Sequence, residues 1–241
     1  MLNKSDYLTS PSTRLAQVLS ELLDVNQALS HQGFVEKIGR LIDFSRAMAL
    51  ADTLNNSVSK GSQVDSAPYF EQMQTVFVDA HKRMVSFISQ TFTASHQDLP
   101  FRLPQATDHS FSQEDGGLSS YQRFYELHQS EMDIGVGRLL KDIRQSLSAC
   151  SPKLARLVEL DMALNTVLAP YSRKLLSAVP RLLAKRFRQL YTSPFIDGGD
   201  IDTSLFVTEM RTVLLAELDI RLQPALGLME ALSIEQENTA L

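Results

Sequence analysis

Apolar side chains recur every three or four residues along most of this 241-residue chain, and no stretch alternates convincingly between apolar and polar residues. A spacing of three and four places side chains on one face of an α-helix, whereas a half-buried strand needs a spacing of two. The sequence therefore predicts an all-α fold, an irregular bundle of about six to seven helices. Short helices would form an N-terminal head, and long kinked helices would form the rest.

Serine followed by proline marks two of the predicted helix starts, because serine caps a helix and proline is tolerated at its first position. Ser10-Pro11 predicts the start of the first helix, and Ser151-Pro152 that of a long helix reaching Leu190. Pro170 and Pro180 should each kink this long helix, because proline removes a backbone donor.

Further long helices are predicted over residues 69–94, from Ser119 or Ser120 onward, and from near Asp202, the last one bent or broken at Pro224. We divide the chain into a short-helix head (1–58) and a long-helix bundle (59–241), which together form one continuous fold. Residues 95–118 are predicted to be a mobile loop, since this segment is longer than ordinary loops.

The composition is that of a globular protein, with 44% hydrophobic and 21% charged residues. The single cysteine, Cys150, cannot form an intrachain disulfide and suits a reducing compartment. A secretory signal would have an apolar segment after Lys4, and none is present. No apolar run approaches the length of a membrane span. We therefore expect a cytoplasmic protein.

His81 and His128 are the candidates for metal ligation, because both fall on the apolar faces of predicted long helices. Two antiparallel helices could bring them together as metal ligands or as an acid–base pair. Bundle metal sites use Glu-x-x-His motifs, however, and here Glu131 follows His128 in the reverse order. The interpretation that we favour is a buried histidine bonded to a backbone carbonyl or a tyrosine. Neither a metal nor a cofactor is predicted.

Other catalytic signals are weak or absent. The cluster of Asp197, Asp200 and Asp202 does not fit a calcium-binding loop, because glycine and glutamate do not stand at the required positions. Cys150 lies near a helix start, which favours the thiolate, but no histidine is near it in sequence. Nucleotide-binding, serine hydrolase and zinc protease motifs are missing. The chain is predicted not to be an enzyme.

The most conspicuous charge pattern is a stripe of basic residues. Its members are spaced by seven, four and three residues, so they lie on one face of a helix. The stripe consists of Lys174, Arg181, Lys185 and Arg188. The net charge of −5 argues against general affinity for nucleic acid. We predict that the stripe pairs with carboxylates of the acidic final helix, chiefly Glu209, Glu217 and Asp219. The alternative is an external anionic partner.

Several stretches of the chain resemble an uncharacterised bacterial family, the domain of unknown function 3348. They are Gly33-Phe34-Val35-Glu36-Lys37-Ile38-Gly39-Arg40-Leu41, Tyr121-x-x-Phe124-x-x-x-His128, Ser151-Pro152-Lys153-Leu154-Ala155-Arg156-Leu157 and Val179-Pro180-x-Leu182-Leu183. The family has no assigned activity or site residues. Its genes tend to lie beside genes for membrane proteins with ion-motor-like and OmpA-like domains, so the resemblance implies a cytosolic accessory subunit of an envelope complex.

Three functions remain open at this point. The favoured one is a non-enzymatic protein–protein interaction or accessory subunit, whose partner is another protein such as a membrane-complex component, or a second copy of the chain. The alternative is binding of nucleic acid or an anionic surface through the basic stretch 173–188. The least favoured is a metal-dependent helical-bundle enzyme that uses His81 and His128.

Overall fold

The structure is a computed structural model, and the residues that it describes are 11–22, 67–93, 99–105, 115, 117–191 and 203–239. Helices account for 89% of the described residues, and no strand occurs among them. The predicted all-α fold is therefore confirmed. The short helices expected in the N-terminal head beyond the first one lie outside the described residues.

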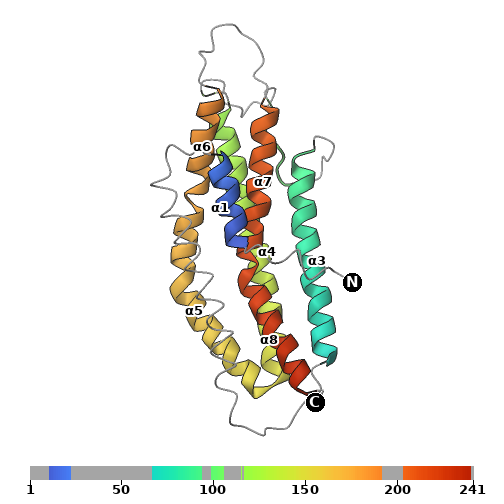
Figure 1. The fold of residues 1–241 in the computed structure, drawn as a ribbon. Helices are drawn as coiled ribbons and strands as arrows, with labels where there is room; N and C mark the ends of the chain where they lie inside the picture. Colours follow the sequence, from blue (N-terminus) through green and yellow to red (C-terminus); the bar gives the residue numbers. More distant parts are fainter. Residues whose placement is uncertain are drawn as a thin grey trace.

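Seven helices make up the described part of the chain: α1 (Pro11–Leu22), α3 (Ala67–Thr91), α4 (Leu118–Cys150), α5 (Pro152–Leu176), α6 (Val179–Leu190), α7 (Ser204–Arg221) and α8 (Gln223–Thr239). They form an elongated bundle in which α3 lies on one side and α5 and α6 on the other (Figure 1). Helix α4 is central, since it packs against α3, α5, α6, α7 and α8, and α1 lies against α7.

The helix starts follow the predicted capping chemistry in one case and depart from it in another. The Ser151 hydroxyl accepts a hydrogen bond from the Leu154 amide at 3.2 Å, as the serine–proline signal predicts. Helix α4, in contrast, is not capped by Ser119 or Ser120. Gly117 stands at the N-cap with φ 85°, a conformation that glycine adopts without strain, and the Asp115 carboxylate accepts from the amides of Gly117 and Ser119.

The two predicted proline kinks have different outcomes. Pro170 lies inside α5, as expected for a kinked helix. Pro180 instead stands in the first turn of α6. The predicted long helix is interrupted at Ser177 and Ala178, which separate α5 from α6. A helix start tolerates proline because the amide there has no intrahelical partner. Pro224 likewise lies in the first turn of α8, so the final helix is broken rather than bent.

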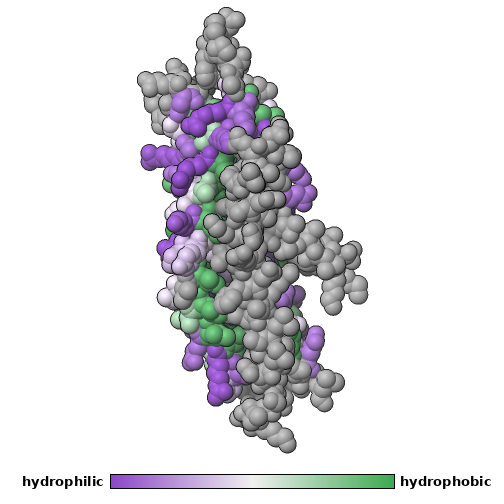
Figure 2. Space-filling view, turned by 60° about the vertical axis from the view of Figure 1, so that its left-hand side comes forward, coloured by the Kyte–Doolittle hydropathy of each residue, from purple (hydrophilic) through white to green (hydrophobic). Residues whose placement is uncertain are grey.

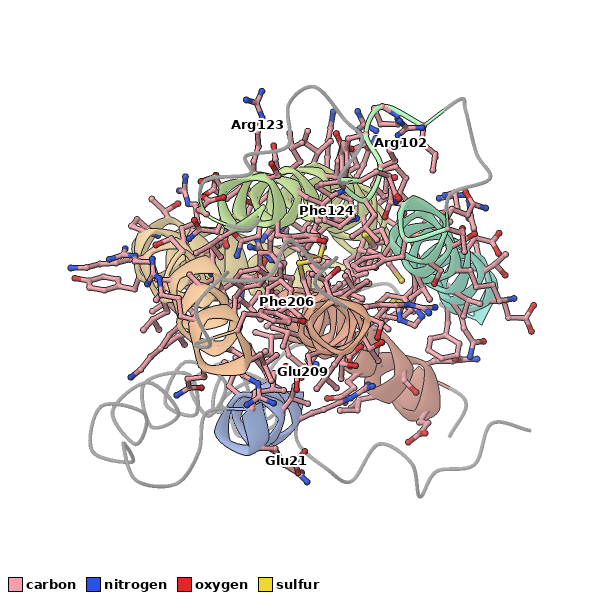
Figure 3. The ribbon with its side chains drawn as sticks, turned by 90° about the horizontal axis from the view of Figure 1, so that it is seen from above. Glu21, Arg102, Arg123, Phe124, Phe206 and Glu209 are labelled. Atoms are coloured by element: carbon pink, nitrogen blue, oxygen red, sulfur yellow. The ribbon has the colours of Figure 1, made fainter. Side chains whose placement is uncertain are left out.

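The core is filled where α4, α6 and α7 meet. The Phe206 ring lies 5.5 Å from that of Tyr121 and 5.0 Å from that of Phe187, both in edge-to-face or tilted arrangements. Phe206 lies among the helices, whereas Arg123 points away from them (Figure 3). On the other side of α4, a side chain at Gly135 would place its Cβ 2.9 Å from the Met84 sulfur. Glycine therefore permits the close approach of α3 to α4.

Part of the predicted mobile loop packs against the bundle. The Leu103 amide donates to the Thr91 carbonyl at 2.8 Å, and the Phe101 ring lies 4.8 Å from the His128 ring and 5.8 Å from that of Phe124. Most of the rest of 95–118 lies outside the described residues, so its mobility stays a prediction.

Candidate functional site

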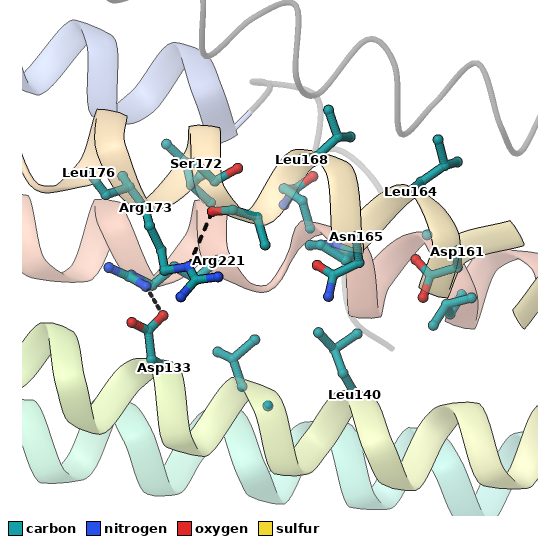
Figure 4. Close-up of a pocket in the computed structure, with 18 of the residues that line it drawn as sticks. Asp133, Leu140, Asp161, Leu164, Asn165, Leu168, Ser172, Arg173, Leu176 and Arg221 are labelled. Atoms are coloured by element: carbon teal, nitrogen blue, oxygen red, sulfur yellow. Dashed lines mark hydrogen bonds and ion pairs between the residues drawn. The ribbon is translucent and has the colours of Figure 1, made fainter. Parts of the chain in front are cut away.

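An open groove of about 440 Å³ lies between α4, α5 and the junction of α7 and α8. Its walls are mainly apolar, with Val136 and Leu140 on α4, Leu164 and Leu168 on α5, and Leu228 on α8. Figure 4 shows these elements from the side, with the α5 residues above α4. The volume falls within the range of pockets that bind small molecules.

The groove opens along the middle turns of α5, where the side chains are less buried than at the start of the helix. Leu154, Leu157 and Val158 are buried near the start of α5, whereas Leu164 and Leu168 are only partly buried. Pro170 lies further along the same helix, where the loss of a backbone hydrogen bond favours bending. The space beside Gly227 is open, because a Cβ there would meet no atom within 4 Å.

Helix α5 also exposes large apolar side chains outside the groove. Leu160, Met162 and Tyr171 are 45%, 53% and 63% exposed. On the side of the molecule that carries α5, Figure 2 shows hydrophobic residues gathered in an elongated band. Single exposed apolar residues are ordinary, but a helix that presents several beside an apolar groove is typical of a surface that binds another molecule.

A buried polar network supports one side of the groove. The Glu217 carboxylate is fully buried, and it accepts hydrogen bonds from the Tyr125 hydroxyl at 2.7 Å, from Gln129 at 2.9 Å and from Arg221 at 2.6 Å. Arg221 also pairs with Asp133, and both residues line the groove. Burial, together with the charge of Glu217, raises the pKa of Tyr125 well above its usual value.

Sequence reasoning missed this network, although a signal for it was present. Glu217 falls on the apolar face of its helix, in phase with Phe206, Met210 and Val213. A glutamate at such a position with an arginine four residues later indicates a buried ion pair. The members of the network bind one another, so the network fixes the position of Arg221.

A second ion pair lies further along the groove. The Arg144 guanidinium on α4 contacts the Asp161 carboxylate on α5 at 2.6 Å, and both side chains are mostly buried. Burial raises the pKa of Asp161, while the charge of Arg144 opposes the rise. This pair joins α4 to α5 beside the groove, where Asp161 forms part of the lining.

The structure does not bring His81 and His128 together. The His128 ring contacts Thr91 at 2.8 Å, ten residues beyond His81 on α3, which is about 15 Å along a helix axis. Asp219 lies near His81. The idea of a joint site is therefore wrong, because the two rings lie at different levels of the bundle.

His128 is instead a core residue, as the favoured interpretation predicted. It is fully buried, with Nδ1 2.9 Å from the Phe124 carbonyl. Since that carbonyl can only accept, the neutral ring carries its proton on Nδ1. Nε2 lies 2.8 Å from the Thr91 hydroxyl oxygen, which also lies 2.8 Å from the Ile88 carbonyl oxygen. Burial lowers the pKa of His128 to about 4.

Other expected chemistry is not assembled in the described part of the chain. No group of three or more His, Cys, Asp or Glu residues there could hold a metal ion. Cys150 is buried, and burial raises the pKa of its thiol, which disfavours the reactive thiolate. The cluster of Asp197, Asp200 and Asp202 lies outside the described residues.

A family described as "Protein of unknown function (DUF3348)" matches residues 1–196 and 198–234. The chain belongs to this family. The resemblance seen in the sequence motifs is thus confirmed and extends over nearly the whole chain. No curated protein and no solved structure shows a significant match. Among the described helices of this DUF3348 chain, none is both long and apolar enough to span a bilayer.

The basic stripe of this DUF3348 protein does not pair as predicted. The three carboxylates expected to face the stripe bind other arginines: Glu209 binds Arg186 at 2.6 Å, Glu217 binds Arg221 at 2.6 Å and Asp219 binds Arg14 at 2.7 Å. The prediction correctly made α6 and α7 neighbours but chose the wrong face of α6. Arg186 faces α7, whereas Arg181 and Arg188 are exposed and Lys185 is half-buried. Lys174 is exposed on α5.

This arrangement predicts which basic residues stabilise the fold. Arg186→Glu should lower the free energy of unfolding by about 2 kcal/mol, because a mostly buried charge-assisted pair is replaced by repulsion. Lys174→Glu with Arg181→Glu should change it by no more than about 0.5 kcal/mol, as for other exposed sites. Urea denaturation of the purified variants measures both effects, and Arg186→Glu/Glu209→Arg should recover part of the loss. If Lys174→Glu with Arg181→Glu lowered the free energy of unfolding by clearly more than about 0.5 kcal/mol, these two residues would be paired with carboxylates after all, as the sequence predicted.

Proposed function

We propose that this protein is a non-enzymatic interaction subunit that holds an α-helix of a partner protein in the groove beside α5. The observation that carries the proposal is the groove itself, which is open, apolar and flanked by the exposed Leu160, Met162 and Tyr171. Apolar grooves between helices are a common docking site for amphipathic helices.

The length of the groove favours a helix over a compact ligand. Its lining on α5 runs from Leu157 to Leu176, a span of 20 residues. At 1.5 Å per residue this distance is about 30 Å, or between five and six helical turns. The lining residues Leu164, Leu168 and Leu175 recur at helical spacing, so they can interdigitate with leucines of a helix laid alongside.

The proposal agrees with what the family resemblance implies, an accessory subunit of an envelope complex. An accessory subunit needs a surface for its partner and no catalytic centre. The charged residues in the groove are compatible with this role, since Asp133, Asp161 and Arg221 already serve in ion pairs between helices.

Site-specific photo-crosslinking in the native host tests the proposal. A benzophenone amino acid replaces Leu168, which is half-buried and lines the groove. Irradiation should yield one dominant adduct, because a helix in the groove would lie against this side chain. Mass spectrometry then identifies the partner and the residues that are joined.

The matched control places the same amino acid at Leu127, which is exposed on α4 and does not line the groove. This control should give no dominant adduct. The proposal fails if Leu168 gives no adduct, or if both positions capture the same set of proteins at similar yield.

A further inference from the structure

The charges of the groove specify the chemistry of the helix that it accepts, provided that the proposed function holds. Four charged residues line it: Asp133, Asp161, Arg173 and Arg221. Three of them are engaged within the protein. Asp133 pairs with Arg221, Asp161 pairs with Arg144, and Arg221 is also bound to the buried Glu217.

Arg173 differs from the other three. It is exposed, and its Nε donates only a long hydrogen bond, at 3.4 Å, to the Ala169 carbonyl of its own helix. Among the described residues no carboxylate pairs with Arg173. Figure 4 shows it on the α5 side of the groove. Arg173 is thus the one charged lining residue with no carboxylate partner among the described residues, whereas Arg221 is bound by two carboxylates, Glu217 and Asp133.

The neighbouring surface has the same sign. Lys174 follows Arg173 on α5, and Arg181 lies one helix further on in α6, both exposed. No acidic residue occurs between Tyr171 and Tyr191. At the other end of the lining, Asp161 is already neutralised by Arg144. The groove therefore combines a long apolar wall with one basic end.

We infer that the partner segment is an acidic amphipathic helix, whose leucine-like stripe fills the groove and whose carboxylates lie against Arg173 and the adjacent Lys174. Charge-assisted hydrogen bonds between guanidinium and carboxylate are short and directional, so Arg173 would set the position of the helix along the groove. Complementary charge contributes chiefly to specificity and to the rate of association, while the apolar wall supplies most of the affinity.

Two synthetic peptides of about 20 residues test this inference, each with leucine at every third or fourth position. Both are acetylated, amidated and labelled with fluorescein, and they differ only in the polar residues of two consecutive turns, glutamate in one and lysine in the other. Fluorescence anisotropy at low salt measures their binding to the purified full-length chain. The glutamate peptide should bind about tenfold more tightly than the lysine peptide, and the difference should shrink at high salt.

Three variants separate the contribution of the Arg173 charge to peptide binding from that of the apolar wall. Arg173→Glu should reverse the preference, so that the lysine peptide binds more tightly. Leu168→Asp should weaken both peptides, because it places a charge in the apolar wall. Arg156→Glu is the matched control, since Arg156 is exposed on α5 and does not line the groove, and it should leave the ratio of affinities unchanged.

Several results would overturn the inference. Equal binding of the two peptides, no binding, or an unchanged preference in Arg173→Glu would each show that Arg173 does not select the partner. Displacement of the glutamate peptide by duplex DNA would assign the basic end to nucleic acid. A concentration-dependent dimer that Leu168→Asp abolishes in sedimentation would make a second copy the occupant. If the photo-crosslink at Leu168 persists while the peptides fail, the proposed function stands and only the acidic character of the partner is wrong.

Discussion

Replacing Glu217 by leucine is expected to lower the free energy of unfolding by about 3–5 kcal/mol, because a buried ion pair loses one of its charges. The Arg221 side chain is only 8% exposed and has Glu217 and Asp133 as its partners. Without Glu217, the Tyr125 hydroxyl and the Gln129 amide would also lose an acceptor. Urea denaturation at 25 °C and neutral pH measures the loss.

A double variant separates the buried charge from simple loss of packing. Glu217→Leu/Arg221→Met removes both charges and should regain part of the stability, since apolar residues replace the buried ion pair at little cost while the Tyr125 hydroxyl and the Gln129 amide still lack their acceptor. Asp133, the remaining partner, is half-exposed and can be solvated. The single variant Arg221→Met completes the comparison. If the double variant lost as much stability as the two single variants together, Glu217 and Arg221 would act independently, and the network would not be a unit.

Acid should destabilise the protein through His128. The folded pKa of about 4 lies below the ordinary value of 6.5, so the unfolded state binds a proton first as the pH falls. Stability from this group is therefore complete at neutral pH and is lost between about 6.5 and about 4. Over that interval the loss amounts to about 3 kcal/mol for a shift of this size.

The comparison with His128→Gln isolates this contribution. Glutamine retains hydrogen-bonding groups but does not titrate, so the variant should be less stable at pH 7 and should lose about 3 kcal/mol less than wild type on acidification to pH 4. Asp161 and Asp219, whose pKa values burial raises, occur in both proteins and cancel in the difference. Parallel pH profiles of the free energy of unfolding would contradict a neutral buried His128.

The elements of this fold were largely predictable because their signals are local. Helical spacing and the Ser-Pro starts predicted α1 and α5 at Pro11 and Pro152, where the structure has them. The breaks were harder to place. Pro180 and Pro224 each stand in the first turn of a new helix, and a proline at the start of a helix and one inside it look alike in sequence.

The candidate site was less predictable because it depends on which helices meet. Helical spacing alone does not show which leucines of α5 face the core: Leu164 and Leu168 line an open groove and Leu160 is exposed. Which arginine pairs with Glu209 depends on the rotation of α6 about its axis, and charge spacing alone does not determine that rotation. His81 and His128 failed as a pair for a similar reason, since their helices are neighbours but their levels differ.

Hydrogen–deuterium exchange of the protein alone and with the partner captured at Leu168 tests the central claim most directly. If a partner helix occupies the groove, amide exchange should slow in two places, residues 157–176 of α5 and residues 223–231 at the start of α8. Residues 67–91 of α3, on the opposite side of the bundle, should exchange at the same rate in both samples. Unchanged exchange in α5, or protection confined to α3, would contradict the account.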